Sequence, residues 1–204
     1  MSTFPGSDFE KKAFDDGIGI VAGVDEVGRG CLAGPVVAAA VVLDLSKPIP
    51  KGLNDSKKLS KKARERIESE LRESAASISI GRVEAPEIDR INILEATRLA
   101  MQTAIEGLDQ RPGLILIDAV SLPKIPIPQK SIIKGDAVSV SIAAASVVAK
   151  VFRDRLMEEY ETVFPGYGFG KNAGYGTAAH FEALRSLGHT PIHRLSFKGV
   201  AQDR

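Results

Sequence analysis

One segment, Gly113–Asp118, constrains the fold of this chain more than any other. It reads Gly-Leu-Ile-Leu-Ile-Asp and is the strongest buried-strand signal in the sequence. A strand this apolar is typical of a sheet that is covered on both faces, so we expect it at the centre of such a sheet. Two more apolar runs, Ile18–Glu26 and Pro35–Leu43, are separated by a glycine-containing turn and are expected to pair as a hairpin.

Helices and strands alternate along the rest of the chain. Further strands are expected at Ser77–Val83 and Ser131–Lys134, and a loop at Phe164–Gly176. Helices are expected where capping residues or long patterned segments occur, namely after Ser60, from Asn92 to Gly107, over Val138–Glu161 and from Thr177 to Leu187. The pattern predicts an α/β domain with a mixed sheet and a small C-terminal helical extension.

The composition excludes several classes of protein. Hydrophobic residues make up 44% and charged residues 26% of the 204 residues, as in an ordinary globular protein. No stretch approaches the roughly 20 apolar residues that span a bilayer, and Met1–Lys12 lacks the layout of a signal peptide. The single cysteine, Cys31, excludes an internal disulfide and a cysteine-rich zinc site. We therefore expect a cytoplasmic protein with no membrane partner, in which Cys31 packs as a small hydrophobic residue.

The net charge of +1 offers no overall basic excess for binding nucleic acid. The local distribution is more informative, because residues 51–66 contain seven basic and two acidic side chains. A basic patch beside an acidic site would suit a metal-dependent nuclease. A solvated helix face is the alternative interpretation of this run.

Four carboxylates fall at the ends of predicted strands. Asp25 and Glu26 end the first strand, Asp118 ends the most apolar one, and Asp136 follows the short strand before the long helix. Functional sites in open α/β sheets form outside strand ends. Carboxylates placed there lose solvation unless a positive charge compensates them. A divalent cation with oxygen ligands, Mg²⁺ or Mn²⁺, would supply that charge.

Other roles for these acids stay open at this point. Asp136 also suits a helix N-cap, and Asp118 a turn residue. Adjacent strand residues point to opposite faces, so Asp25 and Glu26 reach one site only if the strand bulges or ends there. The glycines at 28 and 30 are compatible with such an irregularity.

Six sequence blocks in order resemble the ribonuclease HII family. The similarity covers about Gly23 to Phe197, nearly the whole chain. The blocks are Gly23–Gly30 with Leu32–Ala40, Leu53–Leu59, Ile88–Leu94, Lys134–Asp136, Ala144–Asp154, and Gly174–Thr177 with Thr190–Arg194.

This resemblance implies a ribonuclease H-like fold, with a mixed five-stranded sheet flanked by helices. We expect a catalytic domain over residues 1–160 and a helical extension over 161–204. The resemblance also implies that Asp25, Glu26, Asp118 and Asp136 are catalytic metal ligands. It assigns substrate binding to the Gly28-Arg29-Gly30 turn, which contacts the 2′-hydroxyl, to Tyr175, which stacks on the neighbouring deoxyribose, and to Lys57, Lys58 and Asn92.

The implied activity is cleavage of RNA in RNA–DNA hybrid duplexes and on the 5′ side of single ribonucleotides in DNA. Hydrolysis with two Mg²⁺ or Mn²⁺ ions would leave 3′-hydroxyl and 5′-phosphate ends. The expected partners are these nucleic acids, and the protein is expected to be a monomer.

Three residues depart from the family pattern. Ala119 stands where glycine is common, Asn172 where a histidine or basic residue is frequent, and Leu195 where a second arginine is frequent. The last two substitutions would remove phosphate contacts. The three histidines, His180, His189 and His193, show no metal-ligand spacing, and we expect them to face solvent or cap helices.

Three other functions are compatible with parts of the pattern. A DNase of the same fold class would use similar acids, but the Gly-Arg-Gly turn and Tyr175 favour recognition of a 2′-hydroxyl. A nucleotide-binding module would need the Lys-Ser/Thr pair of a phosphate-binding loop, which is missing after Gly23–Gly30. A non-catalytic RNA–DNA binding protein would have no use for all four acids.

Overall fold

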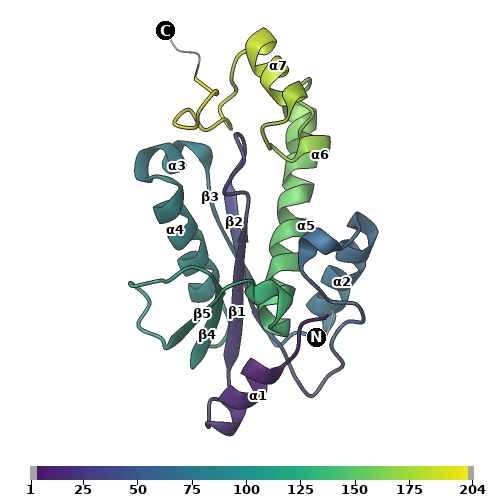
Figure 1. Ribbon diagram of the computed structural model, residues 1–204, viewed down its shortest axis with the longest axis vertical. Helices are drawn as coiled ribbons and strands as arrows, with labels where there is room; N and C mark the ends of the chain where they lie inside the picture. Colours follow the sequence, from purple (N-terminus) through teal and green to yellow (C-terminus); the bar gives the residue numbers. More distant parts are fainter. Residues whose placement is uncertain (1–3, 202–204) are drawn as a thin grey trace.

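A five-stranded mixed sheet lies at the centre of the structure, a computed structural model that describes residues 4–201 (Figure 1). The strands are β1 (Val21–Val27), β2 (Val36–Val42), β3 (Ser77–Val83), β4 (Leu114–Asp118) and β5 (Gln129–Ile132), in the order β3-β2-β1-β4-β5. β2 is antiparallel to β1 and β3, whereas β4 is parallel to β1 and β5. The hairpin prediction is confirmed. β4 is an interior strand beside β1, which occupies the middle.

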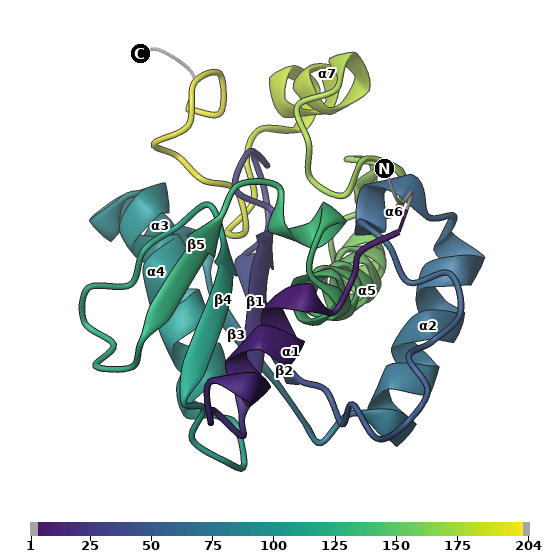
Figure 2. The ribbon, with the colours of Figure 1, turned by 60° about the horizontal axis from the view of Figure 1, so that its bottom comes forward.

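Helices cover both faces of this sheet. They are α1 (Asp8–Asp15), α2 (Lys61–Ser74), α3 (Ala85–Ile91), α4 (Ile93–Glu106), α5 (Val140–Val163), α6 (Phe169–Asn172) and α7 (Ala178–Leu187), with 3-10 turns η1 (Ser56–Lys58) and η2 (Gly135–Ala137). α3 and α4 lie on one face, and α5 with α2 on the other (Figures 1 and 2). α6, α7 and the C-terminal segment lie beyond one end of the sheet, and α1 lies at the other end (Figure 1).

The predicted caps explain where several helices begin. The side chains of Ser60, Asn92 and Thr177 accept hydrogen bonds from backbone N–H groups in the first turns of α2, α4 and α7. The strand expected at Ser131–Lys134 forms two residues earlier, as β5. Two helices were not predicted. α1 forms in a segment expected only to be polar surface, and α6 interrupts the glycine-rich stretch expected to be a loop.

The core forms two apolar layers, one on each side of the sheet. Alternate residues of β2 divide between them, since Ala38 packs toward α4 whereas Val37 and Ala39 pack toward α5. α5 approaches β1 closely because Gly23 has no side chain. A Cβ added there would lie 2.1 Å from the backbone carbon of Ser141.

α1 is anchored at the N-terminal end of α5. The buried carboxylate of Glu10 accepts hydrogen bonds from Ser139 Oγ at 2.6 Å and from the backbone N–H of Ser141 at 3.0 Å. Negative charge is favourable at a helix N-terminus because the free N–H groups point toward it. This contact secures the segment that follows Asp136.

The residues after α5 form a third apolar cluster with the β1–β2 loop. Tyr167, Phe169 and Leu184 pack there against Leu32 and Met157. α5 itself continues through residue 160 to Val163 without interruption. Within residues 4–201, no helix combines the length and apolar character needed to cross a membrane.

The close contact at Gly23 leads to a test of the fold. We expect Gly23→Ala to destabilise the protein by about 3 kcal/mol or more, because the added methyl group must displace the backbone of α5. Urea unfolding measures the effect. Gly19→Ala is the matched control, since a Cβ at that position meets nothing within 4 Å. Equal stability of the two variants would contradict this packing.

Candidate active site

The structure brings the predicted carboxylates toward one region through the parallel strands β1 and β4. Asp25 lies in β1, Asp118 is the last residue of β4, and Asp136 lies in η2 just before α5. The negative charge of Asp118 raises the pKa of Asp25, Glu26 and Asp136. Asp118 is therefore within electrostatic range of all three.

Asp25 is the most perturbed of these groups. Its side chain is buried, and burial followed by the charge of Glu26 raises its pKa well above the usual range. A hydrogen bond from Ser146 of α5 partly offsets this shift. Ser146 Oγ also lies 3.0 Å from Ser56 Oγ, so a chain of hydroxyl groups links η1 to the carboxylate.

The backbone around Asp118 is adapted to orient its carboxylate. Asp118 Oδ1 accepts a hydrogen bond of 2.9 Å from the backbone N–H of Gly135, which connects β4 to η2. Ala119 has a φ of +52°, in the left-handed region that favours glycine. This conformation gives a physical reason why glycine suits the position, and alanine there costs about 1 kcal/mol.

Asp136 is buried and does not cap α5, because that position belongs to Ser139. Burial raises its pKa to about 6, and the charges of Asp55 and Asp118 contribute further. Asp55 was not among the residues predicted for the site. Its position within the basic run 51–66 concealed it, since only the folded chain brings Asp55 close to Asp136.

Glu26 approaches from a different direction. β1 pairs regularly with β2 up to Val27, so no bulge turns Glu26 toward the side of Asp25, and the strand ends one residue after it. Glu26 Oε1 lies 3.4 Å from Arg29 Nη1, and Oε2 is buried with no hydrogen-bond partner among residues 4–201. Burial raises the pKa of Glu26, while Arg29 lowers it.

These donors fit a hard divalent cation. All are carboxylate oxygens, and burial together with neighbouring negative charge raises the pKa of Asp25, Glu26 and Asp136. In the described part of the chain, no three acidic, histidine or cysteine side chains are arranged to hold one ion as they stand. Like charges repel, so closer approach of these side chains requires a cation between them.

The turn after β1 contains two glycines with different structural requirements. Gly28 has a φ of +91°, and a Cβ there would lie 2.3 Å from the guanidinium of Arg153. Gly30 has an ordinary φ, and a Cβ would meet nothing within 4 Å. The fold thus demands glycine at 28 but not at 30, where the backbone is open to an approaching ligand. The side chain of Arg29 is 43% exposed.

Lys57 lies beside the carboxylates, and Tyr175 lies near Lys57. Burial by itself would lower the pKa of Lys57. The negative charges nearby, mainly those of Asp25, Asp136 and Asp55, outweigh this effect, so the pKa of Lys57 is raised. Tyr175 is 42% exposed and within electrostatic range of Lys57. Burial raises the pKa of Tyr175, and a hydrogen bond with Cys31 raises it further. Cys31 is fully buried, as predicted.

Of the two other residues predicted to bind substrate, Asn92 has a structural role and Lys58 is exposed. Asn92 has a φ of +69°, and its side-chain oxygen accepts hydrogen bonds from the N–H groups of Leu94 and Glu95. Lys58 is exposed in η1. Among the departures, Asn172 bridges Tyr167 O and the N–H of Gly174, so it shapes the loop before Tyr175.

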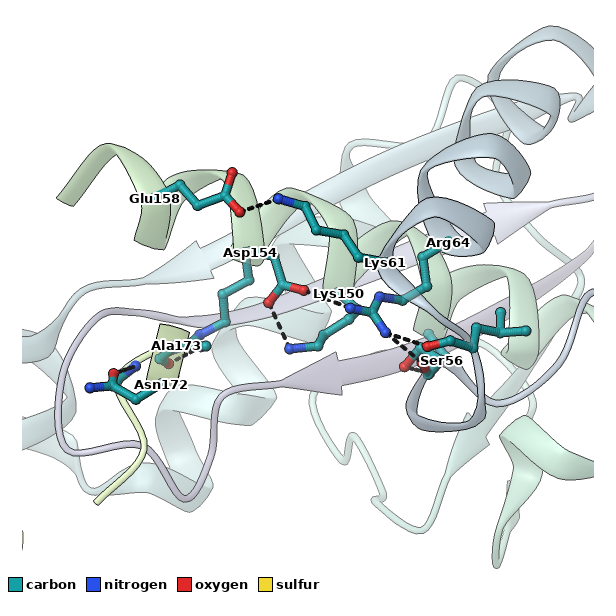
Figure 3. Close-up of polar contacts among 12 residues, drawn as sticks. Ser56, Lys61, Arg64, Lys150, Asp154, Glu158, Asn172 and Ala173 are labelled. Atoms are coloured by element: carbon teal, nitrogen blue, oxygen red, sulfur yellow. Dashed lines mark hydrogen bonds and ion pairs between the residues drawn. The ribbon is translucent and has the colours of Figure 1, made fainter. Parts of the chain in front are cut away.

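The basic run 51–66 is only partly available to a nucleic acid. Figure 3 shows Arg64 and Lys150 both contacting Asp154 of α5, at 3.3 Å and 2.6 Å. Lys61 pairs with Glu158 of the same helix (Figure 3). The ion pairs of Arg64 and Lys61 attach α2 to α5, so this part of the run serves the fold.

Two buried arginines support the loops of the site, and sequence analysis missed both roles. Arg153 donates hydrogen bonds to three carbonyl groups, those of Ala33, Pro35 and Ala173. Arg194 donates to the carbonyls of Gly34 and Arg29. Burial lowers the pKa of Arg194 to about 10. For Arg153, the signal in the sequence was an arginine within a long, largely apolar helix, but its contacts cannot be inferred from spacing.

Comparison with known proteins agrees with this geometry. A family model described as Ribonuclease HII matches residues 22–200. Ribonuclease HII of Desulfitobacterium hafniense (strain Y51) is 54% identical over 194 residues, a match covering 95% of this chain and 74% of that protein.

Solved structures show the same fold. Ribonuclease H2 from Pyrococcus horikoshii OT3 has a TM-score of 0.74 and 28% identity, covering 89% of this chain and 95% of that one. The ribonuclease HII of Archaeoglobus fulgidus, solved in complex with PCNA, has a TM-score of 0.71 and 25% identity, covering 91% and 98%. The expected ribonuclease H-like fold is confirmed. The chain belongs to the ribonuclease HII family, metal-dependent endoribonucleases that cleave RNA in RNA–DNA hybrids.

Proposed function

We propose that Asp25, Glu26, Asp118 and Asp136 together hold divalent Mg²⁺ or Mn²⁺ at the scissile phosphate. The observation that carries this proposal is the position of Asp118: β4 runs parallel to β1, which carries Asp25, and Asp118 Oδ1 accepts a hydrogen bond of 2.9 Å from the N–H of Gly135, the neighbour of Asp136. When bound, the metal ions supply an activated water and stabilise the charge on the leaving oxygen. The products are 3′-hydroxyl and 5′-phosphate ends.

The residues of the chain position the substrate for this reaction. The open backbone at Gly30 admits the 2′-hydroxyl, a group that can both donate and accept hydrogen bonds. The exposed ring of Tyr175 stacks on the deoxyribose of the next nucleotide. Together these contacts recognise an RNA–DNA junction, so the enzyme also cleaves on the 5′ side of a single ribonucleotide in DNA.

The cations near the carboxylates bind the nucleic acid backbone. Lys57 stays protonated because surrounding carboxylates stabilise its charge, and its ammonium group binds a phosphate oxygen. Lys58 and Arg29 are exposed for further phosphate or sugar contacts. Asn92 contributes through its amide nitrogen, since its oxygen is used by α4.

The proposed organisation is a monomeric cytoplasmic enzyme with a catalytic domain over residues 1–160. Residues 161–204 act as an extension that carries Tyr175 to this domain. The apolar cluster around Phe169, Leu32 and Met157 supports this division of roles, because it fastens the extension to the β1–β2 loop.

The direct test uses a labelled DNA duplex with one ribonucleotide, incubated with Mg²⁺, Mn²⁺ or a chelator. We expect metal-dependent cleavage only on the 5′ side of the ribonucleotide. An all-DNA duplex is the control. Cleavage of both duplexes would favour a DNase, and binding without cleavage would favour a non-catalytic role.

A second test concerns the metal ligands. We expect Asp25→Asn to lower kcat/KM at least about 100-fold, since even outer contacts of metal ligands contribute 10–100-fold. The raised pKa means that the folded protein penalises the Asp25 charge, so stability falls as the pH rises through the folded pKa. The metal-free variant should therefore unfold at a higher temperature than metal-free wild type at neutral pH.

Calorimetry with and without Mn²⁺ separates these two effects. Mn²⁺ should raise the unfolding temperature of the wild type much more than that of Asp25→Asn. Asp15→Asn, at an exposed position in α1, is the matched control and should behave as wild type. Full activity of Asp25→Asn would refute the ligand assignment.

A further inference from the structure

The C-terminal segment contains two buried histidines that contact one another. His180 and His193 are 0% and 2% exposed, and their Nε2 atoms lie 3.0 Å apart. Both rings pack against Tyr167 and Phe169. The expectation that these two histidines face solvent or cap helices is therefore wrong, because tertiary packing brings α7 and the following loop together. His189 is exposed, as expected.

The hydrogen-bond partners determine which nitrogens carry protons. His180 Nδ1 lies 2.9 Å from the carbonyl oxygen of Tyr175, which can only accept, so Nδ1 is protonated. His193 Nδ1 receives the backbone N–H of Thr190 at 2.9 Å, so it carries a lone pair. One proton then remains between the two Nε2 atoms, and His193 donates it to His180.

The result is a directed chain of hydrogen bonds that ends at Tyr175. It runs from the Thr190 N–H through His193 and His180 to the Tyr175 carbonyl. The same loop is held at neighbouring residues, since Gly174 O accepts from the N–H of Leu32 and Ala173 O accepts from Arg153. At Tyr175 itself, the N–H donates to Asn172 O and the carbonyl accepts from the Thr177 N–H at 2.8 Å, both within the same loop. The histidine pair supplies the side-chain contact that ties this carbonyl to α7 and the loop after it.

We propose that the His193–His180 pair is a positioning relay that fixes the backbone of Tyr175, so that its ring is oriented to read the RNA–DNA junction. This proposal rests on the proposed role of Tyr175. The histidines do not touch the substrate. They act through the Tyr175 carbonyl, and they make junction recognition sensitive to pH.

Protonation disrupts the relay because each ring nitrogen of the pair already donates or accepts a hydrogen bond. An added proton places a donor where the neighbouring group needs an acceptor. A second proton between the rings places two N–H groups against each other at 3.0 Å. A proton on His193 Nδ1 faces the Thr190 N–H at 2.9 Å and requires the Thr190 hydroxyl, 2.8 Å away, to change from donor to acceptor. The titratable neighbours of the pair are Tyr167 and His189, and neither supplies a negative charge at neutral pH. Burial lowers the pKa of both histidines, that of His193 to about 4.

The experiment compares cleavage of a duplex with one ribonucleotide against cleavage of a continuous RNA–DNA hybrid. Both substrates are cleaved by the same carboxylates, so the titration of these carboxylates changes both kcat/KM values equally. The ratio of the two values therefore reports on junction recognition alone. Tyr175→Ala should lower the ratio about tenfold through loss of stacking. His180→Leu should lower it by about three- to tenfold through displacement of Tyr175.

Conservative and control variants isolate the hydrogen bond. The amide nitrogen of His180→Asn can still donate to the Tyr175 carbonyl, so its ratio should stay within about twofold of wild type at pH 7.5. The wild-type ratio should fall as the pH is lowered to 5, whereas that of His180→Asn should stay constant because asparagine does not titrate and burial holds the pKa of His193 lower, at about 4. His189→Leu changes an exposed histidine and should leave the ratio unaltered.

Each outcome bears on a separate claim. An unchanged ratio in Tyr175→Ala would overturn the proposed role of Tyr175. A reduced ratio in Tyr175→Ala with no change in His180→Leu would overturn the relay alone. Equal losses in His180→Leu and His180→Asn would show that only packing matters, which also overturns it. If His180→Leu does not fold, the pH profile of His180→Asn against wild type decides.

Discussion

The burial of like charges at the ends of β1 and β4 is the constraint on which the rest of this structure depends. Asp25 and Asp136 are nearly inaccessible to water, and burial alone raises the pKa of each. The protein offsets this cost with oriented dipoles and one cation. Ser146 donates to Asp25, the Gly135 N–H donates to Asp118, and Lys57 lies among the acids. A site arranged in this way favours a divalent cation because the remaining negative charge attracts it.

A second principle governs the loops around the carboxylates. Buried arginine and histidine side chains donate hydrogen bonds to the backbone carbonyls of these loops. Arg194 ties the C-terminal segment to the turn that contains Arg29, and Arg153 joins the β1–β2 loop to the loop of Tyr175. His180 extends the same pattern to Tyr175. Buried hydrogen bonds thus hold the loops around the proposed site to the core.

Local sequence patterns predicted most of the secondary structure. The caps at Ser60, Asn92 and Thr177 and the strand 77–83 were correct because each depends on neighbouring residues. α1 was missed because its stability depends on Glu10 meeting the start of α5, about 130 residues away in the chain. The metal-binding roles of the four acids remain predictions. Asp25 and Asp118 come close together because their strands, β1 and β4, are parallel neighbours.

By itself, the sequence determined the sheet, the family and the identity of the four candidate ligands, since apolar periodicity and ordered motifs are properties of the linear chain. Only the tertiary structure decided which polar groups meet. In the folded chain, Asp55 lies near Asp136, and two residues of the basic run form ion pairs with α5. His180 and His193 form a buried pair. The physical reason is that hydrogen bonds and electrostatic forces act over a few ångströms in space, whatever the separation along the chain.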